Sequence, residues 1–241
     1  MRVSLMITCL GDVLRPSAGK SVVNILRRLG HRVDFPRAQT CCGQPMFNGG
    51  LRELAAEQAR HTIECFESSE VVVTPSGSCA AMIKVEYPHL LHGVGEWEER
   101  ANQLAGKTHE FTDFLVNHLG TLELGAKFDG LVAYHHACHL RLLDQTEEVQ
   151  RLIEHVAGAT FVPLDRQDQC CGFGGSFAVR YPHISGALVD DKARCVLATN
   201  AQVVVSTDTG CLMNIGGRLR RQGHDIRAVH IAELLDVEST I

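Results

Sequence analysis

The sequence lacks a basic tract, a long apolar run and a convincing nucleotide-binding motif. Its 241 residues include 23 Lys and Arg against 28 Asp and Glu, so the formal net charge is −5. Without clustered cations to neutralise phosphates, a nucleic-acid partner is not expected. No apolar stretch approaches the roughly 20 residues that cross a bilayer, so no membrane span is expected. No Walker or GxGxxG pattern opens a helix, which argues against a nucleotide site on this chain.

Cysteine, in contrast, is abundant and regularly spaced. Eight of the ten cysteines form two copies of one set of four, and three of the four repeat at an offset of 129 residues. The two sets are Cys9, Cys41, Cys42 and Cys79, then Cys138, Cys170, Cys171 and Cys211. Each set contains an adjacent pair followed by glycine. Four thiolates per half is the ligand number of a tetrahedral zinc ion or a four-iron cluster, so metal binding is the first hypothesis.

Disulfide bonding is a weaker interpretation of these cysteines. A chain of 241 residues, with 45% hydrophobic residues, can bury a core that needs no covalent cross-links. The apolar N-terminal residues run directly into the repeat and are predicted to form a strand instead of a signal peptide. We therefore expect a reducing, cytoplasmic location with metal-bound thiolates.

The repeat extends beyond the cysteines and predicts an α/β fold. Short β-rich runs precede the cysteines in both halves, and helical patterns with apolar residues three and four apart lie between them. The expected strands are residues 3–8, 32–35 and 71–73, then 131–134, 160–162 and 203–205. Alternating strands and helices indicate mainly parallel sheets. We predict two similar α/β lobes from an internal duplication, residues 1–125 with an exposed insertion at about 86–103, and residues 126–241.

In such folds, loops at the carboxyl ends of the strands form the ligand site. The cysteines follow the predicted strands directly, so residues about 70 positions apart can meet at one sheet edge. The adjacent pairs favour an iron–sulfur cluster over one zinc ion, because several irons offer neighbouring thiolates separate targets. Gly43 and Gly172 allow a sharp turn, and their loops allow amide N–H groups to approach sulfur. Cys79 and Cys211 lie at predicted helix N-termini, which favour the thiolate.

Other residues near the motifs are weaker candidates. His135, His136 and His139 surround Cys138, and we expect a hydrogen bond to the cluster or a substrate or proton contact more than direct ligation. Arg141 is a further candidate, as a clamp for a carboxylate. Cys65 and Cys195 lie in mid-helix segments outside the repeat and are interpreted as core residues.

The stretches TCCGQP from Thr40, TPSGSCA from Thr74, CCGFGGSF from Cys170 and GCLMNIGGRL from Gly210 resemble the cysteine-rich, or CCG, domain proteins. That family includes the heterodisulfide reductase B subunit and the glycolate oxidase iron–sulfur subunit. The similarity covers essentially the whole chain and is strongest to short members with two CCG units that take part in lactate utilisation. The family pattern has a further cysteine where this chain has Ser76 and Asp208. This departure favours four thiolates per lobe, with Asp208 as a possible extra oxygen ligand; helix capping is the simpler role for both residues.

The resemblance implies electron transfer through iron–sulfur clusters, expected as 4Fe-4S with up to one per lobe. It implies work beside other iron–sulfur or redox subunits of a cytoplasmic system that oxidises L-lactate to pyruvate, without independent activity of this chain. Two alternatives stay open at this point. One is a zinc-stabilised binding or scaffold module of an oxidoreductase complex, which includes zinc in one lobe beside a cluster in the other. The second is a thiol–disulfide redox protein that uses the adjacent cysteine pairs.

Overall fold

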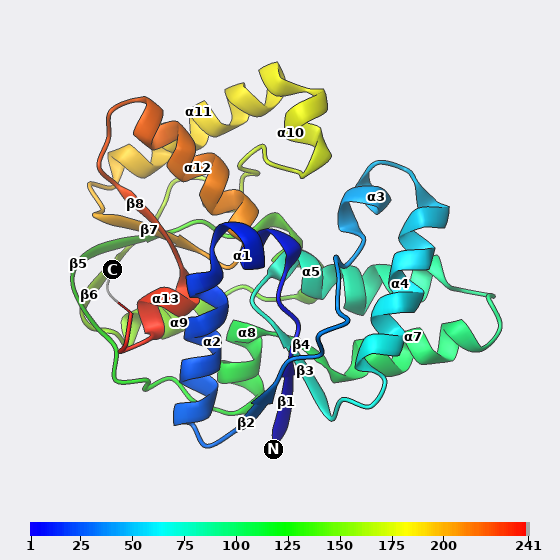
Figure 1. Ribbon diagram of the computed structural model, residues 1–241. Helices are drawn as coiled ribbons and strands as arrows, with labels where there is room; N and C mark the ends of the chain where they lie inside the picture. The colour runs from blue at the N-terminus through cyan, green and yellow to red at the C-terminus, as the bar shows by residue number, and fades with distance from the viewer. Residues whose placement is uncertain (240–241) are drawn as a thin grey trace.

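Two four-stranded parallel β-sheets form the framework of the molecule, which is described by a computed structural model covering residues 1–239 (Figure 1). The strand orders are β2-β1-β3-β4 and β6-β5-β7-β8, and every neighbouring pair is parallel. The strands are β1 (Arg2–Leu5), β2 (Arg32–Asp34), β3 (Val71–Thr74), β4 (Thr108–Glu110), β5 (Lys127–Tyr134), β6 (Ala157–Val162), β7 (Val203–Ser206) and β8 (Arg227–His230). Two sheets with the same connectivity confirm the predicted pair of similar α/β lobes.

The central strands follow from their sequence, whereas the last strand of each sheet does not. All residues of β3 and β7 are buried, as expected for valine-rich strands covered on both faces in a parallel sheet. The short edge strands β4 and β8 have the sequences THE and RAVH, with little hydrophobic pattern. They pair with β3 and β7, and this pairing depends on tertiary contacts that the local sequence does not encode.

Helices surround both sheets and carry the loops that hold the cysteines. The first-lobe helices are α1 (Cys9–Leu14), α2 (Pro16–Arg28), α3 (Gln44–Asn48), α4 (Arg52–Phe66), α5 (Gly77–Ala81), the π-helix η1 (Met82–Glu86), α6 (Tyr87–Leu90), α7 (Glu96–Lys107), α8 (Phe111–Asp113) and the π-helix η2 (Phe114–His118). The second-lobe helices are the 3₁₀ helix η3 (Cys138–Leu143), α9 (Glu148–Glu154), α10 (Ser176–Arg180), α11 (Pro182–Ala198), α12 (Thr209–Arg221) and α13 (Ile231–Leu235). None of the helices within residues 1–239 is long and apolar enough to cross a bilayer.

Two segments differ from the sequence expectation. The apolar pattern of residues 177–197 predicts one long helix, but the helix is broken at Tyr181, which has φ −129° and ψ 57° and precedes Pro182. The proline ring excludes the α conformation at the residue before it, so α10 and α11 are separate helices. The insertion near residues 86–103 is continuously exposed only at 92–96; elsewhere, exposed residues such as Glu99 and Asn102 alternate with buried or half-buried ones. The remainder is helical, and α7 buries Ala101 and Leu104 against the first lobe.

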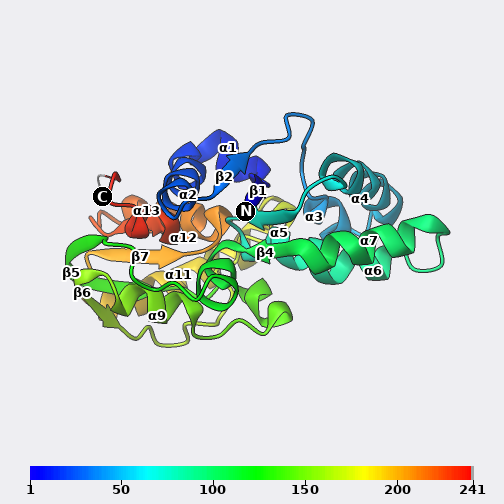
Figure 2. The same ribbon diagram turned by 90° about the horizontal axis from the view of Figure 1, so that it is seen from below.

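The two lobes share one apolar core. A continuous cluster of buried side chains includes Val3, Val22 and Phe114 of the first lobe and Val132 and Leu152 of the second. Helix α2 packs against α13 (Figure 2). Helix α8 of the first lobe packs against α9 of the second. Because this apolar contact is continuous, the lobes are held in a fixed relation, and their cysteine-bearing loops are brought to the same place.

Candidate metal centre

All eight cysteines of the repeat line a single cavity of about 130 Å³, to which both lobes contribute. Each cysteine lies in the loop or helix that follows a strand. Cys9 begins α1 and Cys138 begins η3, whereas Cys79 and Cys211 are the third residues of α5 and α12. The adjacent pairs stand in the loops between β2 and α3 and between β6 and α10. The loops at the strand ends therefore gather residues that are far apart in the chain.

The sulfur atoms within each lobe are close together. In the first lobe, Cys9 Sγ lies 3.5 Å from Cys41 Sγ, and Cys42 Sγ lies 3.3 Å from Cys79 Sγ. None of the ten cysteines, all within residues 1–239, forms a disulfide. In the second lobe the Sγ atoms of Cys171 and Cys211 lie within 4.8 Å of each other. Each set thus contains thiol groups that are close neighbours in space.

The glycine after each adjacent pair has the conformation that the turn requires. Gly43 has φ +86° and Gly172 has φ +84°, values that side-chain-bearing residues seldom adopt. A Cβ atom on Gly172 would lie 2.7 Å from the carbonyl oxygen of Ser185, so no larger residue fits there. Their amides donate to sulfur: Gly43 N lies 3.5 Å from Cys41 Sγ, and Gly172 N lies 3.3 Å from Cys170 Sγ. The turn therefore supplies an N–H···S contact in both lobes.

The thiols of one set also polarise one another. Hydrogen bonds from Cys42 and then Cys9 lower the pKa of Cys41 to about 3. In the second lobe, hydrogen bonds from Cys138 and then Cys171 lower the pKa of Cys170 to about 2. The same contacts raise the pKa values of the donating thiols, because their protons are shared with a thiolate. Each set of four cysteines forms a nest of sulfur atoms, and each nest favours one thiolate even when no cation is bound. A bound metal would allow the other thiols of the nest to ionise.

Two residues that the sequence analysis missed fix the adjacent pairs. The Tyr87 hydroxyl donates to the carbonyl oxygen of Cys42 at 2.7 Å, and Asn214 Nδ2 donates to the carbonyl oxygen of Cys171 at 2.8 Å. Both bonds satisfy a backbone acceptor at the turn and hold the cysteine loop in place. Neither residue is part of the repeated motif, and no spacing in the sequence connects it to the loop that it holds.

Asp208 joins the two lobes beside the cavity. Its Oδ1 atom accepts hydrogen bonds from the hydroxyls of Ser76 and Ser78, both at 2.6 Å. Asp208 is 6% exposed and makes no side-chain cap to its own helix α12. Ser76 instead caps α5, since its Oγ accepts from Cys79 N at 3.2 Å. Ser76 is therefore a helix cap, as expected, but Asp208 does not cap its own helix. Its carboxylate lies instead at the N-terminus of α5, in the first lobe.

The candidate polar residues around Cys138 occupy different environments. His139 lines the cavity; its Nδ1 lies 3.6 Å from Cys138 Sγ, and its Nε2 lies 2.9 Å from Nε2 of Gln44 in the first lobe. His136 is buried, and its Nε2 lies 2.9 Å from the carbonyl oxygen of Gln145. Arg141 is exposed and pairs with Asp168 at 3.3 Å. Of these three, His139 is the residue placed to meet a molecule in the cavity.

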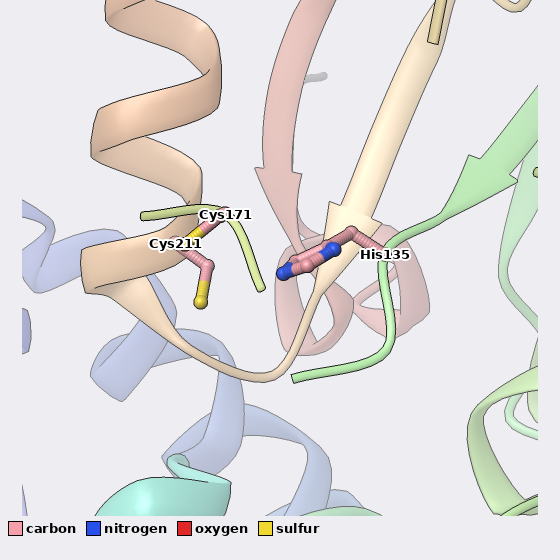
Figure 3. A group of neighbouring side chains, drawn as sticks. All are labelled: His135, Cys171 and Cys211. Carbon is pink, nitrogen blue, oxygen red and sulfur yellow. The ribbon is translucent and has the colours of Figure 1, made fainter. Parts of the chain in front are cut away.

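His135 lies against the sulfur atoms of the second lobe (Figure 3). Its imidazole is fully buried, and a ring nitrogen, Cys171 Sγ and Cys211 Sγ all lie within 4.8 Å of one another. Burial, followed by the positive charge of Lys192, lowers the pKa of His135 to about 3. The imidazole is therefore neutral at pH 7 and has a lone pair available.

The two remaining cysteines do not line the cavity. Cys65 packs at the edge of the first lobe's own core, and Cys195 is buried in the second lobe's core, where its Sγ accepts from Arg166 at 3.3 Å. Core packing therefore accounts for both side chains.

The donor set suits an iron–sulfur group. Each lobe offers four soft sulfur ligands from three separate loops, with an amide N–H directed at one of them. The adjacent pairs stand on sharply turned backbone, so their thiolates reach different points of the nest. A polynuclear group gives each thiolate its own metal atom.

Comparison with known proteins agrees with this donor set. The sequence pattern of the cysteine-rich (CCG) domain matches residues 3–84 and 132–216, one copy in each lobe. The chain belongs to the CCG family. Each match includes the four cysteines of one set, from the strand before the first to the helix that carries the last.

Relatives of this CCG protein match over nearly their whole length. It is 50% identical to the Lactate utilization protein A of Geobacillus thermodenitrificans over 98% of this chain and 99% of the relative. It is 46% identical to the Lactate utilization protein A of Bacillus subtilis over 98% of this chain and 99% of that one. A hypothetical protein from Helicobacter pylori shares the fold at a TM-score of 0.66 and 11% identity, with 100% of this chain and 49% of that chain covered.

Proposed function

We propose that this protein is an iron–sulfur electron-transfer subunit of a cytoplasmic, multi-subunit system that oxidises L-lactate to pyruvate. The observation that carries the proposal is that eight free cysteines, four from each lobe, line one cavity. The names of the relatives supply the connection to lactate. Duplicated sites on one short chain suit a protein whose task is to hold redox groups near each other.

Within this proposal, residues 1–125 and 126–241 are the two cluster-binding lobes. Cys9, Cys41, Cys42 and Cys79 hold one cluster, and Cys138, Cys170, Cys171 and Cys211 hold the second, each taken as 4Fe-4S. When bound, such a cluster supplies reversible one-electron transfer. The chain itself fixes the thiolates, and the amides of Gly43 and Gly172 donate to sulfur, which stabilises added negative charge.

The exposure of the cysteines supports electron exchange with partner subunits. Cys9 is exposed, whereas Cys42 and Cys79 are buried behind it. One edge of the first nest therefore lies at the surface, where a redox subunit can approach the cluster. Because the two nests border one cavity, electrons that enter through one lobe have a short path to the other.

Metal and sulfide analysis of the anaerobically purified chain tests the proposal. We expect iron with acid-labile sulfide and a visible absorption band. Cys41→Ser should remove the iron of the first lobe, and Cys171→Ser should remove the iron of the second. The matched control is Cys65→Ala, which changes a cysteine of the core and should retain all the iron.

The alternatives give different results in the same experiment. Stoichiometric zinc without sulfide would replace the proposed function with that of a zinc-stabilised binding module. A metal-free chain that forms a mixed disulfide at Cys41 or Cys170 would identify a thiol–disulfide protein. Full iron content after the Cys41→Ser substitution would refute the ligand assignment in the first lobe.

A further inference from the structure

The two nests differ at one structurally equivalent position. His135 N donates to the carbonyl oxygen of Val205 at 2.9 Å, and Met6 N donates to that of Val73 at 2.9 Å. Both residues follow the central strand of their sheet, three positions before the first cysteine of the set, and both are buried. The first lobe therefore places an apolar thioether side chain where the second lobe places an imidazole.

The imidazole of His135 lacks a full hydrogen-bond partner in its buried position. Within residues 1–239, neither of its ring nitrogens makes a hydrogen bond of ordinary geometry, and the backbone carbonyl of Gln167 approaches the ring too loosely for a full bond. Two other buried histidines do: His136 bonds the carbonyl of Gln145, and His230 bonds that of Thr207. Burying a polar group that lacks a hydrogen-bond partner costs free energy, because nothing replaces its bonds to water. Met6 shows that an apolar side chain fits the equivalent place in the first lobe.

The surroundings of His135 supply the missing partner if a metal is bound. A ring nitrogen lies within 4.8 Å of the sulfur atoms of both Cys171 and Cys211, and the imidazole points toward them in Figure 3. A nitrogen ligand of an iron held by one of these cysteines would lie beside that cysteine's sulfur, since such bonds are about 2.1 and 2.3 Å long. The imidazole is therefore a neighbour of an iron bound there, and each thiolate keeps its own metal atom.

We propose that His135 is a nitrogen ligand of the metal group in the second lobe, so that the two sites are chemically different. The first site is bound by thiolates alone, and the second by thiolates and a neutral imidazole. The inference rests on the proposed function, since it requires iron in the second lobe.

The variant His135→Met tests the assignment, because it gives the second lobe the residue that the first lobe already has. The full-length chain is purified anaerobically and reduced, and its nitrogen couplings are measured by pulsed paramagnetic resonance. Labelling histidine with ¹⁵N identifies the imidazole signal. We expect strong histidine coupling in the wild type, its loss in His135→Met, and its retention in the control His139→Gln, which alters a histidine beside Cys138.

The outcomes separate the two proposals. Iron and sulfide in both lobes without histidine coupling, or coupling that persists in His135→Met, would overturn the ligand assignment and leave the electron-transfer function intact. Absence of iron from the wild-type chain would instead overturn the proposed function. If His135→Met folds poorly, His135→Gln provides the same measurement with a polar side chain, and circular dichroism confirms that the variant is folded.

Discussion

Replacing Asp208 with alanine removes a carboxylate that joins the lobes beside the cavity. Asp208 belongs to the second lobe, but its Oδ1 accepts from the hydroxyls of Ser76 and Ser78 in the first, both at 2.6 Å. The side chain is 6% exposed, so little water is available to replace these bonds. The substitution therefore breaks the two charge-assisted bonds from the hydroxyls and a longer bond from Ser78 N, and it leaves the two hydroxyls with only each other as partners.

The size of the effect follows from these bonds. A hydrogen bond to a charged group contributes about 1.5 to 3 kcal/mol, so losing the two bonds from the hydroxyls in Asp208→Ala should lower the free energy of unfolding by about 3 to 6 kcal/mol. Asp208→Asn retains an acceptor oxygen but loses the charge, and should cost about 1 to 2 kcal/mol. Against a typical total of about 5 to 15 kcal/mol, the alanine variant loses a large share of its stability.

Urea unfolding measures this difference, with all variants compared at the same iron content. The alanine variant should shift the midpoint by roughly 1 to 2 M. Because the apolar core is continuous across both lobes, a single transition is expected. The control Asp168→Ala removes a carboxylate that is 63% exposed and should change stability little. An alanine variant as stable as that control would show that the contact between Asp208 and the two serines does not hold the lobes together.

Three further predictions concern other buried groups. Burial raises the pKa of Glu110 from 4.5 to about 8, so the folded state binds this proton more tightly than the unfolded state does. The free energy of unfolding should therefore fall by up to about 5 kcal/mol as the pH rises from 4.5 to 8. Glu110→Gln should flatten the dependence of the melting temperature on pH between 5 and 8, and an unchanged slope would show that Glu110 is not the titrating group. Tyr87→Phe loses the bond to the Cys42 carbonyl and should cost about 1 kcal/mol and alter only the first lobe's cluster spectrum, whereas a change in the second lobe would argue against a local role. Cys195→Ala should cost about 1 to 2 kcal/mol in denaturation and leave iron content unchanged, and loss of iron would identify it as a ligand.

Much of the framework was predictable because local patterns in the sequence encode it. The duplication follows from the cysteine spacing, and the valine runs at Val71 and Val203 form the buried strands that parallel sheets require. The edge strand β4 and the break at Tyr181 were missed for different reasons. The strand has almost no hydrophobic pattern and forms by pairing with β3. Pro182 encodes the break, but the apolar residues on both sides of it keep the spacing of one helix.

The roles of the residues around the site were harder to predict. The sequence places three histidines beside Cys138 without distinguishing them. His139 lines the cavity, His136 bonds the carbonyl of Gln145, and His135 lies against Cys171 and Cys211. Which side chain points to the sulfur atoms depends on where strand β5 ends and how the following loop turns. That direction is set by the packing around the loop, so residue type and spacing alone do not determine it.

The sequence by itself determined the repeat, the parallel α/β lobes and the position of each cysteine after a strand, since periodicity and turn residues act over a few neighbouring positions. Tertiary structure alone decided that both sets of cysteines border one cavity, that Asp208 bonds the serines of the opposite lobe, and that His135 meets the sulfur atoms. These arrangements depend on how the shared apolar core sets one lobe against the other. This packing brings together residues that are more than 100 positions apart in the chain, so no local sequence pattern can encode their contacts.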